Sequence, residues 1–205
     1  MNGKLPAAEE DSPSAVEESA WLAQLQQGDR QAFARIYERY RVRIYSFLLR
    51  LCGRRDQADD LLQDTFVQLA RHAPRLRAET QLGPWLYTVA RNRYLSQRRT
   101  AMSRLAQLRD FFFGHNPGAL QLASGPQHSA SERQEIRQLE AALQHLSPPL
   151  REVILLVAVE ELDQNQAAEV LRLQPAALRK RLERARAQLQ SILSQSERGG
   201  RDGNP

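Results

Sequence analysis

Cysteine is nearly absent from the 205 residues, since Cys52 is the only one. A lone cysteine excludes an internal disulfide framework and suits a reducing compartment. No apolar run approaches the roughly 20 residues that a membrane span needs. A secretory signal would place basic and then apolar residues at the N-terminus, whereas acidic residues crowd it: Glu9, Glu10, Asp11, Glu17 and Glu18. We therefore expect a cytoplasmic chain without membrane insertion.

Residue groupings typical of catalysis are also missing. The four histidines are scattered at positions 72, 115, 128 and 145, without metal-ligand spacing. We find no supported Ser-His-Asp or Cys-His grouping, and no glycine-rich loop that could hold a phosphate. The sequence therefore predicts no enzyme, no cofactor and no metal site.

Strand patterns are nearly absent too, and what remains is helical periodicity with an uneven charge. Residues 1–19 carry a net charge of −4. Residues 20–100 hold fifteen arginines and seven acidic residues, a net charge of +8. Residues 132–169 carry −5 and residues 170–205 carry +5. A basic module, followed by a module with one basic end, favours a DNA partner, although solvated arginine-rich helix faces would give the same charge pattern.

The first helical block runs from residue 29 to about residue 99. Apolar residues at three- and four-residue steps predict one amphipathic helix over 29–52, ended by Gly53. Asp56 and Asp59 indicate the start of a second helix, which Pro74 closes. After a polar loop, Pro84 suits the first turn of a third helix that runs to about residue 99. We expect a helical bundle with short connections.

Glycine, proline and serine interrupt this pattern over residues 100–131, which predicts a linker. Phe111, Phe112 and Phe113 stand out in it. Two interpretations stay open: a tether to a neighbouring helix, or insertion into a groove of a partner.

The second helical block begins near Ser131 and ends in two short helices joined by a turn at 172–174. Asp163 and Gln166 predict a capping box for the first of these helices, and the second is basic, so the pair reads as a helix-turn-helix. Arg172 stands in the turn where glycine would be easiest, and a residue other than glycine can occupy this turn if its backbone stays out of the left-handed region. A helical hairpin with a solvated basic face is the structural alternative.

With both blocks in view, the sequence resembles the sigma-70 family, and specifically its extracytoplasmic-function group. Residues 20–100 look like region two of that family and residues 132–195 look like region four. Three segments in the family's order carry the resemblance: DQADDLLQDTF at 56–66, WLYTVARN at 85–92, and the helix-turn-helix at 162–186, which ends in RLERAR.

The resemblance implies a sigma factor that binds core RNA polymerase and directs promoter recognition and DNA melting. For contact with the polymerase core it implies Asp60, Leu61, Gln63, Asp64 and Phe66. For recognition and melting of the minus-ten element it implies Arg75, Arg77, Tyr87, Arg91, Asn92, Arg98 and Arg99. For reading the minus-thirty-five element in the major groove it implies Ala176, Arg179, Lys180, Arg181 and Arg184. By spacing, Tyr87 should be exposed as a stacking platform, whereas Trp85 should lie in the core.

These segments give an all-α fold of two helical modules joined by a flexible linker. We expect an acidic disordered tail at 1–19, region two at 20–100, the linker at 101–131, region four at 132–195 and a disordered tail at 196–205. An anti-sigma factor is a further candidate partner, since such partners are common in the group. The alternative function is a helix-turn-helix regulator that does not replace sigma, and it leaves the segments at 56–66 and 85–99 unexplained.

Overall fold

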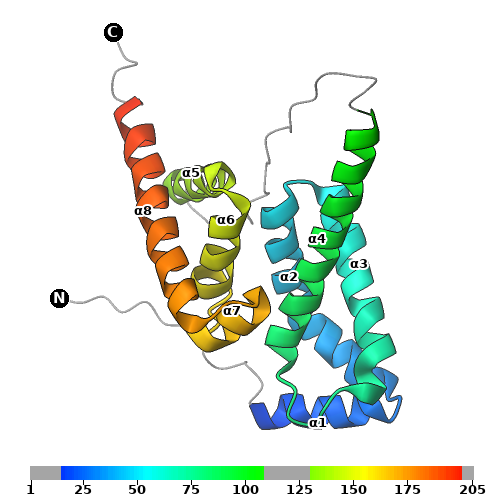
Figure 1. The fold of residues 1–205 in the computed structure, drawn as a ribbon. Helices are drawn as coiled ribbons and strands as arrows, with labels where there is room; N and C mark the ends of the chain where they lie inside the picture. The colour runs from blue at the N-terminus through cyan, green and yellow to red at the C-terminus, as the bar shows by residue number, and fades with distance from the viewer. Residues whose placement is uncertain (1–14, 109–129, 200–205) are drawn as a thin grey trace, which may run out of the picture.

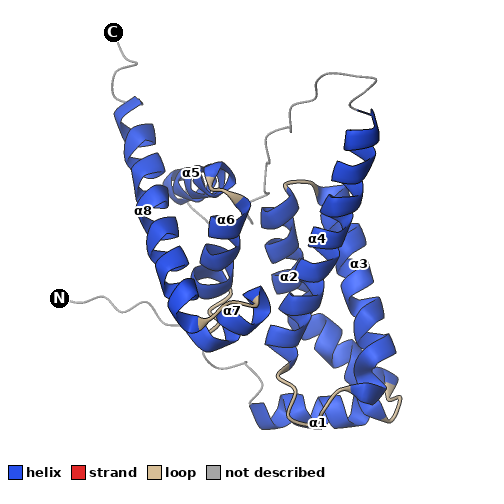
Figure 2. Cartoon of the chain, in the orientation of Figure 1, coloured by secondary structure: helices blue, strands red, loops and turns tan. Residues whose placement is uncertain are grey.

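The computed structural model describes residues 15–108 and 130–199, and within these ranges helices are joined by turns and loops, with no strand. The predicted all-α fold is therefore confirmed (Figures 1 and 2). The elements are α1 Ala15–Gln26, α2 Arg30–Cys52, α3 Arg55–His72, the 3₁₀ turn η1 Ala73–Arg75, α4 Leu82–Leu108, α5 Ala130–His145, α6 Pro148–Ile154, the π-helical turn η2 Leu155–Val159, α7 Gln164–Leu171 and α8 Pro175–Gly199.

Helices α1 to α4 form the N-terminal module. In Figure 1, α2, α3 and α4 run side by side and α1 crosses them at one end. Asp29 caps α2 by accepting a hydrogen bond from the backbone N–H of Gln31 at 2.8 Å. Gly53 ends it with φ at 76°, a conformation that favours glycine, and its N–H bonds to the carbonyl of Leu49. The predicted bounds of this helix are thus confirmed to within a residue.

The core of the N-terminal module forms where the apolar stripes of its helices meet. The largest side chains that solvent does not reach are Leu22, Ile36, Ile44, Phe47, Leu48, Leu61, Leu69, Leu82, Leu86 and Tyr87. Helix α1 supplies Leu22, although the sequence patterns did not predict this helix. It begins at Ala15, inside the segment 1–19 for which we expected a disordered tail.

Helices α5 to α8 form the C-terminal module. Pro148 and Pro149 occupy the first turn of α6, where the missing N–H groups need no helical partner. The capping box of α7 is confirmed: the Asp163 side chain accepts from Asn165 and Gln166, and the Gln166 side chain accepts from the Asp163 N–H. Residues 172–174 then turn the chain into α8.

Arg172 does not meet the condition stated for a residue other than glycine in this turn, because its φ of 54° and ψ of 48° lie in the left-handed region. A side chain there costs roughly 1 kcal/mol compared with glycine. Two short backbone bonds offset that cost: Arg172 N–H donates to Glu169 at 3.0 Å, and Leu173 N–H donates to Ala168 at 2.8 Å. These bonds close the end of α7 in the way a glycine cap would.

Helix α4 continues to Leu108, nine residues beyond the predicted end at Arg99, and α5 begins at Ala130. Helix α8 extends to Gly199. The rest of the predicted linker, with Phe111, Phe112 and Phe113, lies outside the described residues, and so do residues 200–205. We find no segment among the described helices with the length and hydropathy of a membrane span.

The two modules pack directly against each other. Helix α7 lies against α4, and the C-terminal end of α2 meets α5 and α6, so the buried apolar residues form one continuous cluster (Figure 1). The side chain of Arg151 in α6 donates to the carbonyls of Arg50 and Leu51 at the end of α2, and Gln144 in α5 donates to Arg50 at 3.0 Å. A cation at a helix C-terminus donates hydrogen bonds to carbonyls that have no partner within the helix. Its charge is also attracted by the negative end of the helix dipole.

Candidate functional site

The outer face of α3 carries the acidic residues for which we expected contact with polymerase. Asp60, Gln63 and Asp64 are exposed, and their spacing of three and four residues places them on one side of the helix. Leu61 and Phe66 are buried instead. Phe66 packs edge-on against Tyr37 with ring centroids 4.7 Å apart. These two side chains therefore hold the helix in the core, and only the polar three are available to a partner.

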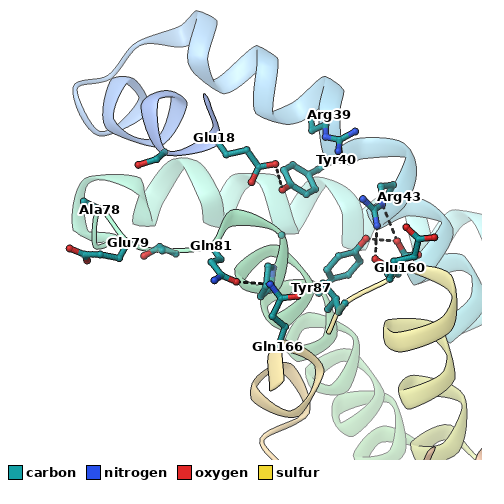
Figure 3. A pocket seen from close by; sticks show the side chains of 16 residues that line it. Glu18, Arg39, Tyr40, Arg43, Ala78, Glu79, Gln81, Tyr87, Glu160 and Gln166 are labelled. Carbon is teal, nitrogen blue, oxygen red and sulfur yellow. Dashed lines mark hydrogen bonds and ion pairs between the residues drawn. The ribbon is translucent and has the colours of Figure 1, made fainter. Parts of the chain in front are cut away.

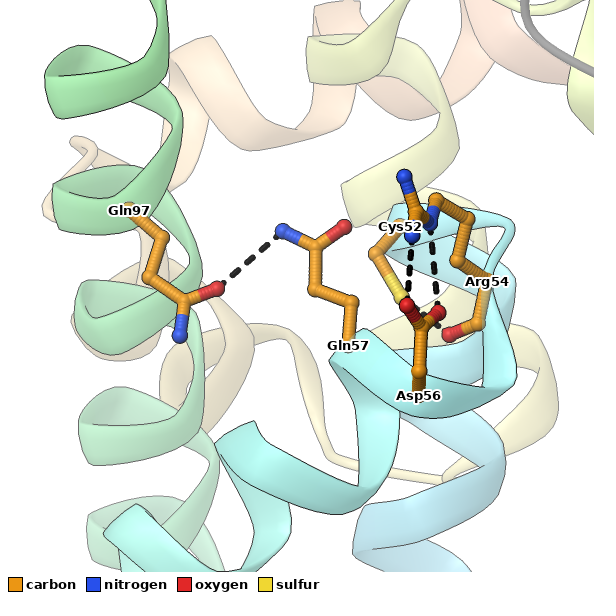
Figure 4. A network of polar contacts seen from close by, with 5 residues as sticks. All are labelled: Cys52, Arg54, Asp56, Gln57 and Gln97. Atoms are coloured by element: carbon orange, nitrogen blue, oxygen red, sulfur yellow. Dashed lines mark hydrogen bonds and ion pairs between the residues drawn. The ribbon is translucent and has the colours of Figure 1, made fainter.

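The start of α3 lies one residue before the predicted Asp56, because Arg54 is the N-cap and the helix begins at Arg55. Figure 4 shows the Arg54 guanidinium on the Asp56 carboxylate, and this contact lowers the pKa of Asp56. Gln57 donates to Gln97 of α4 at 3.1 Å, which ties the two helices together. The charge of Asp56 is thus paired within the chain, whereas Asp59, Asp60 and Asp64 are exposed on α3, and Asp60 and Asp64 lie on one side of the helix.

The residues expected to contact the minus-ten element divide into an exposed group and a covered group. Arg75 and Arg77, in the turn after α3, are exposed, and so are Arg98 and Arg99 on α4. Asn92 is half-buried. The Arg91 side chain is only 13% exposed, and its guanidinium lies on the Glu152 carboxylate of α6 at 3.0 Å from both Nε and Nη2.

Tyr87 contradicts our expectation of an exposed stacking platform, because it is 1% exposed. Its ring packs edge-on against Phe47 at 5.2 Å, and its hydroxyl donates to the Glu160 carboxylate. Burial raises the pKa of this hydroxyl above its usual range. Trp85, expected in the core, is half-buried near His72. Spacing along α4 could not give this result, since the C-terminal module covers the Tyr87 face.

A cavity of about 530 Å³ lies where the two modules meet (Figure 3). Its wall combines the loop before α4 with α1, α2 and the start of α7. Across it, Tyr40 donates to Glu18 at 2.7 Å, and the Gln166 amide of α7 donates to Gln81 at 2.7 Å. Arg43 donates to the Glu160 carbonyl at 2.6 Å and contacts its carboxylate at 3.4 Å. Acidic and basic side chains both line this cavity, so its charge favours neither a simple anion nor a simple cation.

Carboxylates of the C-terminal module pair with arginines of the N-terminal module at three places. The pairs are Arg91 with Glu152, Arg43 with Glu160, and Arg50 with Glu140 at 3.7 Å. Burial raises the pKa of Glu140 and of Glu160. Sequence reasoning missed all three pairs. The signal in the sequence was the opposite net charge of residues 20–100 and 132–169, which we had interpreted as a DNA-binding surface or as solvated helix faces and not as a contact between the modules.

Helix α8 presents a basic outer face. Its inner face is fixed by Leu178, Leu182 and Ala185, which are all buried against α5, α6 and α7. The residues expected to read DNA lie opposite: Ala176, Arg179, Lys180 and Arg184 are exposed, and Arg181 is half-buried. The predicted order of a supporting helix followed by a basic helix is therefore present in α7 and α8.

No cluster of three or more histidine, cysteine, aspartate or glutamate side chains in the described residues could hold a metal ion. Cys52 is half-buried, and its thiol donates to the Arg54 carbonyl at 3.2 Å. Burial raises the pKa of this thiol, which lowers its reactivity.

Comparison with known proteins matches both modules. The family model for Sigma-70 region 2 matches residues 36–104, and the model for Sigma-70, region 4 matches residues 136–189. The RNA polymerase sigma factor CnrH of Cupriavidus metallidurans is 30% identical over 179 residues, which cover 83% of this chain and 91% of CnrH. The ECF RNA polymerase sigma factor SigM of Bacillus subtilis is 28% identical over 157 residues, covering 77% of this chain and 92% of SigM.

Among solved structures, the chain resembles the sigma factor RpoE from Bartonella quintana, crystallised in complex with the anti-sigma factor NepR. The TM-score is 0.69 at 23% identity, over 79% of this chain and 96% of that one. A likeness at this identity supports the fold.

Proposed function

The chain belongs to the sigma-70 family of RNA polymerase sigma factors, in its extracytoplasmic-function group. From this premise we propose which of its surfaces contacts core polymerase and which surfaces contact the two promoter elements. As a member of that family it directs RNA polymerase to promoters, and it acts by binding rather than by catalysis. This assignment rests on one observation: α3 carries an exposed acidic face, and a different helix, α8, carries an exposed basic face.

The acidic face of α3 is the proposed contact with core polymerase. Asp60 and Asp64 lie one turn apart with Gln63 beside them, and all three are exposed. Carboxylates in this arrangement suit a basic partner surface, to which arginine can donate two parallel hydrogen bonds. Leu61 and Phe66 support the surface from beneath, because their burial fixes the rotation of α3 about its axis.

The basic side of the N-terminal module is the proposed site for the minus-ten element and for DNA melting. Arg98 and Arg99 are exposed on α4 and can follow a phosphate backbone, and the half-buried Asn92 can read a base edge. Arg75 and Arg77 border the same loop that lines the cavity and can hold an unstacked strand. Arg91 belongs to this set, although its guanidinium contacts the Glu152 carboxylate of α6 in this structure.

Helix α8 is the proposed reader of the minus-thirty-five element. The face that carries Arg179, Lys180 and Arg184 is exposed, and a helix of this kind fits the major groove. Its N-terminal positions, Ala176 and Ala177, offer only apolar contact, so hydrogen-bonded base reading falls to the basic residues. Arg181, half-buried, is placed to position its neighbours or to reach a phosphate.

Two further proposals follow from the family. The chain works in the cytoplasm, where bacterial RNA polymerase and promoter DNA are found. An anti-sigma partner is also proposed for it, since RpoE from Bartonella quintana was crystallised with one.

Permanganate footprinting of holoenzyme tests the division of labour. Wild-type chain with core polymerase should give reactive thymines near the minus-ten element of its promoter. Arg98→Ala with Arg99→Ala should reduce this reactivity while binding to core is retained. Arg179→Ala with Lys180→Ala should instead weaken recruitment of holoenzyme to duplex DNA. Loss of core binding in the Arg98 and Arg99 variant would contradict the proposed assignment.

A further inference from the structure

Helix α8 carries one acidic residue on its otherwise basic outer face. Residues 172–186 include six basic residues, and Glu183 is the only acid among them. At about 100° of rotation per residue, Glu183 lies roughly 140° around the helix axis from the buried Leu178. It is exposed, and it lies on the same outer side as Ala176 and Lys180. Glu183 therefore belongs to the face of α8 that the proposed function places in the major groove.

Contacts within the chain do not account for an acid at this position. No hydrogen bond or ion pair joins the Glu183 carboxylate to another described residue, although Arg179 and Arg186 lie four residues before and three residues after it. The helix dipole does not account for it either, because α8 begins at Pro175 and an acid is favoured only in the first turn. On a DNA-binding face a carboxylate is repelled by phosphates, so its advantage must lie in discrimination between sequences.

The base edges of the major groove show what a carboxylate can discriminate. Guanine presents the acceptors N7 and O6 and thymine presents the acceptor O4, whereas cytosine N4 and adenine N6 are donors. Arginine and lysine side chains only donate, so Arg179 and Lys180 can read only acceptors. An ionised glutamate only accepts, so Glu183 can read only an amino group. Cytosine suits it better than adenine, because adenine places its N7 acceptor beside the amino group.

We propose that Glu183 is a specificity-determining residue of α8, which accepts a hydrogen bond from the N4 amino group of a cytosine in the promoter duplex. It selects this base while it lowers the affinity of the helix for DNA of unrelated sequence. The basic residues around it supply the attraction to phosphates and the reading of acceptors. This proposal rests on the proposed role of α8 as the reader of the minus-thirty-five element.

Selection from a randomised duplex library, with holoenzyme assembled on core polymerase, tests the assignment without a known promoter. The wild-type chain should enrich a motif with a cytosine in its upstream element. Glu183→Ala should remove the preference at that position alone, and Glu183→Gln should shift it toward adenine, because an amide can pair with both N6 and N7 of that base. Glu169→Gln is the matched control, because it removes the same charge from an exposed acid of α7, and it should return the wild-type motif.

Fluorescence anisotropy with the selected duplex gives the size of the effect. Replacing the cytosine by thymine, with adenine opposite, should weaken binding of wild-type holoenzyme by about five- to 150-fold. The same replacement should weaken binding of the Glu183→Ala holoenzyme by less than about threefold. Binding of this variant to a duplex of unrelated sequence should be as tight as wild type or tighter, because a negative charge is gone. A purely structural role for Glu183 would instead weaken binding to all of these duplexes equally.

Three results would overturn the proposal: an unchanged motif for Glu183→Ala, an equal loss of affinity for the cytosine and thymine duplexes, or the same change of motif in Glu169→Gln. The proposed function is judged separately, by the wild-type selection. A wild-type holoenzyme that enriches no upstream element would refute promoter reading by α8. A wild-type motif that Glu183→Ala leaves unchanged would refute only the role of Glu183.

Discussion

Charge reversal at Asp64 should separate polymerase binding from folding. Asp64 is exposed on α3 and makes no hydrogen bond or ion pair with another described residue, so Asp64→Arg should change the free energy of unfolding by no more than about 0.5 kcal/mol. Truncating one partner of a hydrogen-bonded interfacial charge pair costs about 2–5 kcal/mol, and reversal adds repulsion. Affinity for core polymerase should therefore fall by about 30-fold to several thousand-fold.

Asp59→Arg is the matched control for this prediction. Asp59 is also exposed on α3, but five residues of helix place it about 140° around the axis from Asp64. Its reversal makes the same change in net charge and should leave core affinity within about threefold of wild type. Surface-immobilised core polymerase gives the dissociation constants, and circular dichroism during urea unfolding gives the stabilities.

Two results would refute the reasoning. Wild-type affinity of the Asp64→Arg variant would remove the outer face of α3 from the polymerase contact. Equal losses in the Asp59 and Asp64 variants would show that the chain's overall charge, rather than this face, controls binding.

The remaining predictions concern stability and DNA binding. Leu61→Ala should lower the free energy of unfolding by about 2–5 kcal/mol, because Leu61 is fully buried, and a smaller loss in urea unfolding would mean that α3 is loosely packed. Arg172→Gly should raise it by about 1 kcal/mol by relieving the left-handed backbone, and a lower melting temperature would contradict that φ. Arg184→Ala should weaken duplex binding and reduce its salt dependence by about one phosphate contact, and an unchanged slope would place Arg184 off the DNA. Burial raises the pKa of Glu160, which faces Tyr87, Arg43 and Arg50, above its ordinary 4.5, so its contribution to stability is full below that value and is lost as pH rises through the raised pKa. Glu160→Gln should remove this part of the pH dependence in urea unfolding, and an unaltered profile would assign it to another group.

Local patterns predicted most of the helices, because their signals lie within a few residues of one another. Gly53 ends α2 and Asp163 caps α7, and each acts on its own turn of chain. The exposed faces of α3 and α8 also follow from periodicity within a single helix. Helix α1 was not predicted, because its charged N-terminal residues obscured the apolar contribution of Leu22.

The contact between the modules could not be predicted in the same way. The spacing within α4 predicted that Tyr87 is exposed. This prediction failed because the spacing gives no information about a second module more than 40 residues further along the chain. In the sequence, Glu152 and Glu160 do not differ from the other acids of an acidic segment. Only the fold shows that they lie against Arg91 and Arg43. Likewise, the left-handed turn at Arg172 depends on backbone bonds that close the end of α7.

The division of promoter-directing work between the modules is tested most directly by transcription from genomic fragments of the source bacterium with purified core polymerase. Core with the wild-type chain should initiate at a defined set of start sites that core alone does not use. Core with the Asp64→Arg variant should lose these sites, while the variant keeps its affinity for duplex DNA. Initiation at the same sites by core alone, or by core with the Asp64→Arg variant at wild-type levels, would contradict the account.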